Sequence, residues 1–327
     1  MEESHIKYHF VIKLNHIKIS SQLSKGKIIK EGMRISNGTA NFNSNFNNAP
    51  FRESFGLVEF ASFEDSVYIY EVGDFENIQQ KMGFKLDEIQ LVNFLIRKVE
   101  VFLACLWLVK DNSITSEVGF LHMYDKDPKR GIFSSNVIPN LPSTSDGEFR
   151  NTEFNVNELD QAIKYYQEFT FDSKSNHSDI ITQLENPLTK GSKRVDRAFY
   201  FLGNARNTTA LPIKALNYCS LLECLFTNDS GEITHKVSER FAFFIGNDFE
   251  ERKALFKMTK ELYKIRSKAT HGQPVGTHPD QMRSLLMEID NKVREILLTS
   301  INKEAKSEVF NLQNESFDNW FLDLILR

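Results

Sequence analysis

The sequence predicts an α+β protein, with a mixed α/β domain containing antiparallel strands at the N-terminus and an all-α helical bundle at the C-terminus. The chain has 327 residues, more than the ~100 to 200 residues of a usual single domain. Near the N-terminus apolar and polar residues alternate, as in strands. In the C-terminal part apolar residues recur every three or four positions, as in helices. We therefore assign residues 1–185 to a first domain and residues 186–327 to a second.

Two strand-like segments open the N-terminal domain. Residues 8–19 begin as an apolar run and then alternate, and residues 55–72 repeat that pattern. β-branched and aromatic residues with a period of two are typical of strands. The asparagine-rich segment 36–50 lies between them. Asn and Gly favour turns, so we expect this segment to be a loop or a hairpin tip without a role in the core.

Helical patterns follow the strands. Residues 86–109 are apolar on almost every side, which predicts a helix packed at the centre of the N-terminal domain. Residues 157–169 predict a shorter helix. Between these helices, residues 123–155 are rich in Pro, Asp and Gly, and this composition predicts exposed connections.

The C-terminal domain is predicted to contain five helices and an amphipathic tail. Pro212 suits a helix start, whereas Gly246 and Gly272 suit helix ends. The apolar spacing gives helices over residues 193–206, 212–226, 233–245, 250–270 and 279–301. The tail has an apolar face that we expect either to strengthen a subunit interface or to dock on the N-terminal domain, formed by Phe317, Trp320, Phe321, Leu324 and Ile325.

Composition and missing motifs exclude several classes of protein. The longest apolar run, residues 101–109, is too short for the roughly 20 residues that span a bilayer, and the chain starts with acidic residues. We predict a cytoplasmic protein without membrane contact. The three cysteines form no CxxC pair, so we expect reduced core thiols and no metal or cofactor. The nucleotide-binding patterns GxxxxGK[ST] and GxGxxG are absent, as are HExxH and GxSxG.

Charge is distributed unevenly along the chain. The net charge of the whole chain is −4. Residues 190–300 nevertheless hold 18 Lys and Arg against 13 Asp and Glu, a local net charge of +5. A basic segment within an acidic chain indicates a polyanionic partner such as nucleic acid.

The segment Tyr-Lys-Ile-Arg-Ser-Lys-Ala-Thr-His-Gly, residues 263–272, closes the fourth predicted C-terminal helix. Its Arg266 and His271 resemble the R-x4-6-H motif of the HEPN superfamily, and its wording resembles the Apea-like branch. The Leu-Leu-Glu-Cys-Leu-Phe run of residues 221–226 also resembles this family. The resemblance covers about residues 190–300. It implies a dimeric bundle of four or five helices and, in active members, a metal-independent endoribonuclease of the toxin or antiphage-defence type.

The chemistry of RNA cleavage explains why an arginine and a histidine are needed. Without a metal, a base must take the proton of the ribose 2′-hydroxyl, an acid must protonate the leaving 5′-oxygen, and a cation must stabilise the phosphorane. His271 suits the acid and base roles, and Arg266 suits bidentate contact with phosphate. Five helical residues turn through about 500°, which leaves the two side chains about 140° apart. Both reach one phosphate only if the helix end unwinds or two subunits contribute, so we expect a homodimer.

Glu223 is the third candidate for the catalytic site. It lies one turn after Cys219 on an apolar helix stripe, so we expect it to be at least half buried and to need a basic partner. Arg266 and Arg240 are the candidates for this partner. With Arg266, Glu223 would orient the catalytic arginine; a purely structural ion pair is the alternative.

A lysine stripe precedes the motif on the same predicted helix. Lys257, Lys260, Lys264 and Lys268 recur, after Lys253, at spacings of three or four residues, which places them on one helix face. We expect this stripe to bind RNA, with His235 and Arg240 of the preceding helix lining the same groove; a solvated helix face is the alternative.

Three other interpretations remain open at this point. Arg266 and His271 can serve a surface ion pair and a helix C-terminal cap, where positive charge is favoured. An inactive HEPN domain can act as an RNA-binding or dimerisation scaffold. A DNA-binding regulator is the third, but the sequence has no helix-turn-helix signature. In the leading interpretation, residues 1–185 sense a trigger or restrain the nuclease.

Overall fold

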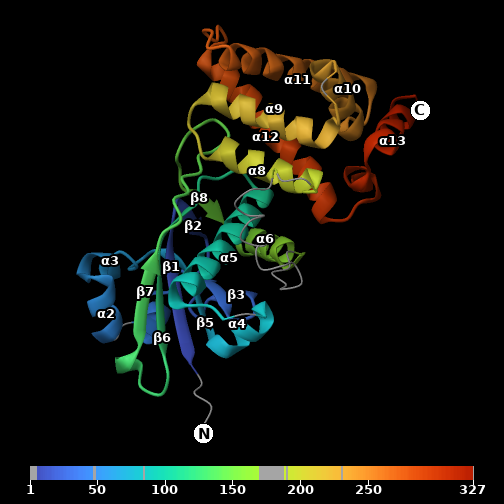
Figure 1. Cartoon of the computed structure of the whole chain (residues 1–327). Coiled ribbons are helices and arrows are strands. Elements are labelled where there is room, and N and C mark those ends of the chain that lie inside the picture. Colours follow the sequence, from blue (N-terminus) through green and yellow to red (C-terminus); the bar gives the residue numbers. More distant parts are fainter. Residues whose placement is uncertain are drawn as a thin grey trace. The chain divides into compact units, whose positions relative to one another are not determined.

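The computed structural model describes residues 6–46, 49–83, 85–168, 188, 191–229 and 231–326, and contacts divide the chain into two units (Figure 1). The N-terminal unit comprises residues 1–140 and 150–176, and the helical unit comprises residues 141–149 and 177–327. The fold class is α+β, as predicted. The segment 141–149, which the sequence assigns to the first domain, belongs to the helical unit. The proposed boundary at residue 185 falls outside the described residues.

Six antiparallel strands form the main sheet of the N-terminal unit, in the order β3-β4-β5-β1-β6-β7. Strands β2 and β8 form a separate parallel pair. The first predicted strand is confirmed as β1 and β2. The strands are β1 Lys7–Asn15, β2 Ile17–Ile19, β3 Lys27–Lys30, β4 Met33–Ser36, β5 Val67–Asp74, β6 Thr115–Tyr124, β7 Ile132–Asn136 and β8 Thr152–Phe154.

Helix α5 (Glu88–Val109) covers one face of this sheet (Figure 1). Asp87 and Gln90 form a capping box at its start, which satisfies backbone N–H groups that the first turn leaves unpaired. Most apolar residues of α5 are buried, so the predicted central helix is confirmed. Helix α6 (Val156–Glu168) packs on α5, as the predicted short helix, and α4 (Phe75–Met82) follows β5.

The opposite sheet face carries an aromatic cluster, and this corrects two predictions. The segment predicted as a loop forms α1 (Thr39–Phe46) and the start of α2 (Ala49–Phe55), and the predicted second strand begins as α3 (Leu57–Ala61) before β5. Phe42 and Phe46 are spaced four residues apart among the asparagines, as are Phe51 and Phe55 in α2. Each pair therefore lies on one face of its helix. The clustered residues are buried: Val11, Phe42, Phe46, Phe51, Phe55, Phe60, Phe63, Tyr68, Tyr70 and Phe120.

The turn-rich segment 123–155 is also more structured than predicted. It contains β7, β8 and the short 3₁₀ helix η1 (Pro128–Arg130). Ser143 is fully buried within the helical unit, where its hydroxyl donates to the carbonyl oxygens of Arg206 (3.1 Å) and Thr208 (2.7 Å). These bonds tie the segment to the end of a helix, so part of it lies in the interior and not at the surface.

All five predicted helices of the C-terminal region are confirmed. Helix α9 is central and contacts α8, α10, α11 and α12. Tyr218 on α9 donates to Asp290 on α12 at 2.7 Å, and Arg294 pairs with the same buried carboxylate. The helices are α8 Arg194–Arg206, α9 Leu211–Phe226, α10 Ile233–Ile245, α11 Phe249–Thr270 and α12 Pro279–Ile301, followed by η2 Ala305–Asn311 and α13 Asn314–Ile325.

The amphipathic tail forms α13 and docks on the helical unit itself. Phe317 and Phe321 are fully buried, and the Phe321 ring lies 5.8 Å from that of Phe226. Trp320 packs near Phe244 on α10. The helical unit itself therefore buries Phe317 and Phe321. The two predicted locations of this apolar face, a subunit interface and the N-terminal domain, stay predictions for the partly exposed Trp320, Leu324 and Ile325. Among the described residues, none of the helices combines the length and apolar character needed to cross a bilayer.

Candidate active site

Helix α11 carries the predicted motif and ends where the sequence indicates. Gly272 has a left-handed backbone (φ +64°), which glycine adopts without steric cost. Its N–H donates to the Ala269 carbonyl oxygen, and the Gln273 N–H donates to that of Lys268. This pair of bonds is a Schellman motif, which satisfies carbonyl groups left open at a helix end. The motif therefore lies at a well-defined helix terminus.

His271 is exposed at the C-cap of α11, directly before this turn. Its N–H donates to the Ser267 carbonyl oxygen at 3.2 Å, so helical hydrogen bonding continues up to His271. The helix does not unwind between Arg266 and His271. Their side chains therefore diverge by about 140° around the helix axis, and one chain does not direct both at the same phosphate.

Arg266 forms a small cluster with Glu223 on α9 and Tyr263 on its own helix. An Arg266 guanidinium nitrogen lies 3.8 Å from the Glu223 carboxylate, and the Tyr263 hydroxyl donates to the same carboxylate oxygen at 3.1 Å. The side chains of Arg266 and Glu223 are 37% and 21% exposed. An ion pair this exposed contributes at most about 1 kcal/mol to stability. Its main effect is to orient a guanidinium that solvent can still reach.

Tyr263 fixes the Glu223 carboxylate of this cluster through its hydrogen bond. Burial raises the pKa of the Tyr263 phenol well above its usual value, and the nearby Glu223 charge acts in the same direction. The phenol therefore stays protonated and acts as a hydrogen-bond donor. Sequence reasoning gave Tyr263 no role, although it precedes Arg266 by three residues and so lies on a neighbouring part of the helix surface.

Arg240 does not join this cluster, and it does not line the lysine groove either. It is 7% exposed. One guanidinium nitrogen donates to the Phe226 carbonyl oxygen at 3.0 Å, another pairs with Asp318 at 2.5 Å, and the group lies over the ring of Phe321. Arg240 thus anchors α13, so its predicted places in the lysine groove and beside Glu223 are wrong.

The lysine stripe of α11 faces away from Arg266. All five lysines are exposed, whereas Arg266 turns toward α9. Successive helical residues rotate by 100°, so the centre of the stripe lies about 160° from Arg266 around the axis. The stripe reaches the end of the helix at Lys268 as predicted, but it lies on another face from the motif arginine.

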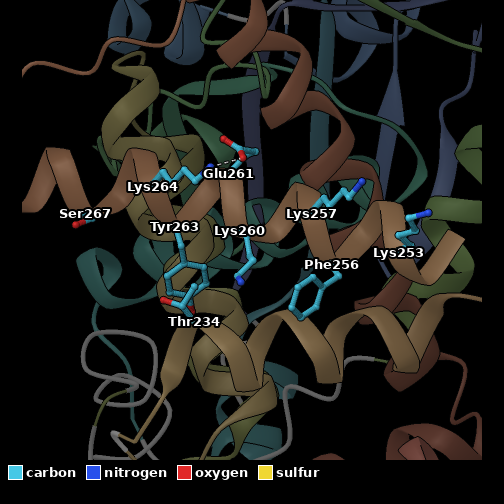
Figure 2. Close-up of a pocket in the computed structure, with 9 residues that line it drawn as sticks. All are labelled: Thr234, Lys253, Phe256, Lys257, Lys260, Glu261, Tyr263, Lys264 and Ser267. Carbon is cyan, nitrogen blue, oxygen red and sulfur yellow. Dashed lines mark hydrogen bonds and ion pairs between the residues drawn. The ribbon is translucent and has the colours of Figure 1, made fainter. Parts of the chain in front are cut away.

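A groove lies between α10 and α11 on the lysine side (Figure 2). It has a volume of about 570 Å³. A neighbouring depression shares Thr234 and Lys260 with it and includes His235, so His235 lies beside the groove and is not one of its lining residues. The groove is lined by Thr234, Lys253, Phe256, Lys257, Lys260, Glu261, Tyr263, Lys264 and Ser267.

Within the described part of the chain, no cluster of three or more His, Cys, Asp or Glu side chains is arranged to hold a metal ion. Cys105 and Cys219 are buried, Cys224 is half-buried, and all three are free. Comparison with family models, curated proteins and solved structures gave no match to this chain. The resemblance to HEPN domains therefore rests on the motif residues alone and stays a prediction.

Proposed function

We propose that this chain is a metal-independent endoribonuclease whose reaction depends on Arg266 and His271. The observation that carries the proposal is the Arg266 cluster. Glu223 and Tyr263 hold a solvent-accessible guanidinium at the end of α11, within one and a half turns of an exposed imidazole. An oriented guanidinium suits a phosphate, because its planar fork matches two phosphate oxygens.

The reaction is an attack of the ribose 2′-oxygen on the adjacent phosphorus. The bond from phosphorus to the 2′-oxygen forms as the bond to the 5′-oxygen breaks, giving a 2′,3′-cyclic phosphate and a 5′-hydroxyl. A neutral imidazole takes the 2′-hydroxyl proton, and a protonated imidazole gives a proton to the 5′-oxygen. Arg266 stabilises the negative charge on the phosphorane oxygens. Glu223 is a positioning residue, since it acts through Arg266.

The proposal includes a homodimer formed through the helical unit. The regular helix end separates Arg266 from His271 by about 140°, and the reaction needs an acid, a base and a cation around one phosphate. A two-fold axis beside the motif brings a second Arg266 and a second His271 to the site. Sedimentation at assay concentrations tests this part, because a strictly monomeric protein that still cleaves RNA rules out a shared site.

The biological setting is the least constrained part of the proposal. The HEPN resemblance supports a cytoplasmic toxin or antiphage-defence enzyme in which the N-terminal unit senses a trigger or restrains cleavage. One observation favours an inactive RNA-binding or dimerisation scaffold instead. The lysine stripe and Arg266 lie on different faces of α11, so RNA can bind the stripe without meeting the arginine.

The decisive experiment is incubation of the purified full chain with total RNA in EDTA. Under the proposal, RNA is nicked, and the products carry cyclic phosphate and 5′-hydroxyl ends. Binding without nicking supports the scaffold. Nicking that EDTA abolishes contradicts the metal-independent mechanism.

A further inference from the structure

The groove between α10 and α11 combines cations with an aromatic ring. Figure 2 shows Phe256, Lys260 and Tyr263 extending from α11 toward Thr234 of α10, while Lys257 and Lys264, which also line the groove, extend from the other side of α11. Phe256 is half-buried. The His235 ring meets it edge-on at 5.5 Å, and the Lys260 ammonium lies 5.0 Å from its centre. The ring is thus fixed in place with cations beside it.

The lysines of this groove carry more positive charge than their neighbours balance. Glu261 pairs with Lys264 at 2.6 Å, and Glu250 pairs with Lys253 at 3.7 Å. No ion pair joins Lys257 to a carboxylate in the described parts of the chain, and Lys260 faces an aromatic ring. Like charges that crowd one helix face repel each other. A bound polyanion relieves this repulsion, and release of its counterions adds to the affinity.

An aromatic floor favours one class of polyanion over the others. Single-stranded nucleic acid offers unpaired bases that stack on aromatic side chains while its phosphates contact lysines. In a duplex the bases stack on one another and are not available to a protein ring. An acidic peptide has no base to stack on the ring. The groove volume of about 570 Å³ is that of a site for one small-molecule-sized group, such as a single base with its sugar.

We infer that this groove binds single-stranded RNA, with one base stacked on Phe256 and the adjacent phosphates held by Lys257, Lys260 and Lys264. The choice of RNA rests on the proposed function. Ser267 lines one end of the groove and directly follows Arg266 in the chain. Tyr263 lines it too and hydrogen-bonds Glu223, so the groove and the Arg266 cluster share a wall. From Phe256 to Ser267 the helix rises about 16 Å, which separates the stacked base from the scissile phosphate.

The test measures binding separately from cleavage. A labelled 2′-O-methyl oligoribonucleotide keeps the bases and phosphates but lacks the attacking hydroxyl, so the wild-type full chain can bind it without cutting it. Fluorescence anisotropy then compares this strand with its duplex and with a poly-glutamate peptide. The variants are Phe256→Leu, which keeps apolar volume, Phe256→Tyr, which keeps the aromatic face, and Phe249→Ala as a control. Phe249 belongs to the same helix and is 72% exposed.

We expect Phe256→Leu to weaken single-strand binding about tenfold, the loss typical of one stacked base, and Phe256→Tyr and Phe249→Ala to bind like wild type. Reversing Lys257, Lys260 and Lys264 to Glu should also reduce the slope of log K against log salt by about 2. The charge-matched control reverses the exposed Lys126, Lys129 and Arg130 of the N-terminal unit. Proper folding of each variant is checked by circular dichroism.

The outcomes separate this inference from the proposed function. If RNA is nicked but the Phe256 and lysine variants bind the oligonucleotide like wild type, the groove inference is wrong and the nuclease proposal stands. If no RNA is nicked but these variants lose binding, the reverse holds. Binding of the duplex or of poly-glutamate as tight as that of the single strand overturns the inference, because the groove then recognises negative charge and not unpaired bases.

Discussion

The sheet core of the N-terminal unit and helix α11 of the helical unit use ionisable residues in different ways. In the N-terminal unit, His122 is 1% exposed and stacks on Phe133 at 4.0 Å, and Lys98 pairs with buried Glu71 at 2.5 Å. In the helical unit, His271 and the lysines of α11 are exposed. Buried charges must be paired because desolvation is costly, whereas exposed ones remain available to ligands. We therefore expect substitutions in the first set to change stability and substitutions in the second set to change the proposed cleavage and binding of RNA.

The largest expected effect is on the reaction of the helical unit. His271→Ala should lower the rate of RNA cleavage by about 10² to 10⁴, the usual contribution of a positioned acid or base. The melting temperature should not change, because the side chain is exposed at the C-cap. The control is His278→Asn, an exposed histidine at an N-cap where Asn also caps well. Cleavage by His271→Ala at the wild-type rate would remove His271 from the mechanism.

Removal of a buried charge from the N-terminal unit should lower the free energy of unfolding instead of the cleavage rate. Lys98→Met leaves the Glu71 carboxylate buried, with the Tyr8 hydroxyl still donating to it but no cation beside it. Leaving one charge of a buried pair uncompensated costs about 3 to 5 kcal/mol, which urea unfolding measures. Lys81→Met is the matched control, since Lys81 and Glu31 are both 60% exposed and such pairs contribute about 0 to 1 kcal/mol. Equal losses in both variants contradict the comparison.

Acid should also weaken the N-terminal unit through His122. Burial, together with the nearby charge of His9, lowers the pKa of His122 from 6.5 to about 4. The unfolded chain therefore binds a proton first as pH falls, so stability is complete above pH ~6.5 and declines between ~6.5 and ~4, by about 3 kcal/mol in total. Unfolding free energies at pH 7 and pH 5 measure this decline. His122→Phe should flatten it, and an unchanged decline would assign it to other groups.

Arg266→Lys tests whether shape or charge matters at the exposed site. A lysine keeps the positive charge but lacks the planar fork that contacts two phosphate oxygens, so we expect a loss of roughly 10² in cleavage rate, comparable to removal of one transition-state hydrogen-bond donor. Arg283→Lys is the control, because Arg283 is a surface residue that pairs with Asp280 and Glu148. If Arg266→Lys cleaves RNA normally, Arg266 contributes only charge.

Sequence periodicity predicted the helical unit better than the N-terminal one, for a physical reason. Helices α8 to α12 each bury one stripe, so the apolar period is visible in the sequence. Among their described side chains, helices α1 and α2 bury Phe42, Phe46, Phe51 and Phe55. Mostly polar residues separate these phenylalanines, Asn and Ser in α1 and Arg, Glu and Ser in α2, so the local composition resembles that of a loop. Tertiary packing against the sheet determines those helices, and one sequence does not reveal it.

The candidate site was predictable where chemistry is local. The motif and its helix end follow from spacing along α11. Spacing along α9 predicted that Glu223 is partly buried, but it left both Arg266 and Arg240 as candidate partners, and the structure pairs Glu223 with Arg266. Arg240 was assigned wrongly because its partner Asp318 lies 78 residues away in sequence and no local pattern connects them. The sequence analysis placed the lysines on one face of the helix but did not place that face relative to Arg266. Counting helical rotation from Lys264 to Arg266 separates their faces, and the contact with Glu223 bears this out.

The smallest expected effect concerns Tyr263. Its ring is buried, and its hydroxyl donates to the Glu223 carboxylate of the candidate site, so Tyr263 can contribute both to stability and to the proposed reaction. Tyr263→Phe keeps the ring and removes one hydrogen bond worth about 0.5 to 1.5 kcal/mol. If that bond positions Glu223, and through it Arg266, kcat should fall by up to about tenfold while KM stays unchanged, because the interaction matters only in the transition state. Tyr218→Phe is the matched control. It removes a buried hydroxyl from Asp290 in the same unit and should reduce stability without changing kcat. Should Tyr263→Phe lower the melting temperature and leave kcat intact, Tyr263 belongs with the structural set, and Arg266 is positioned by Glu223 alone.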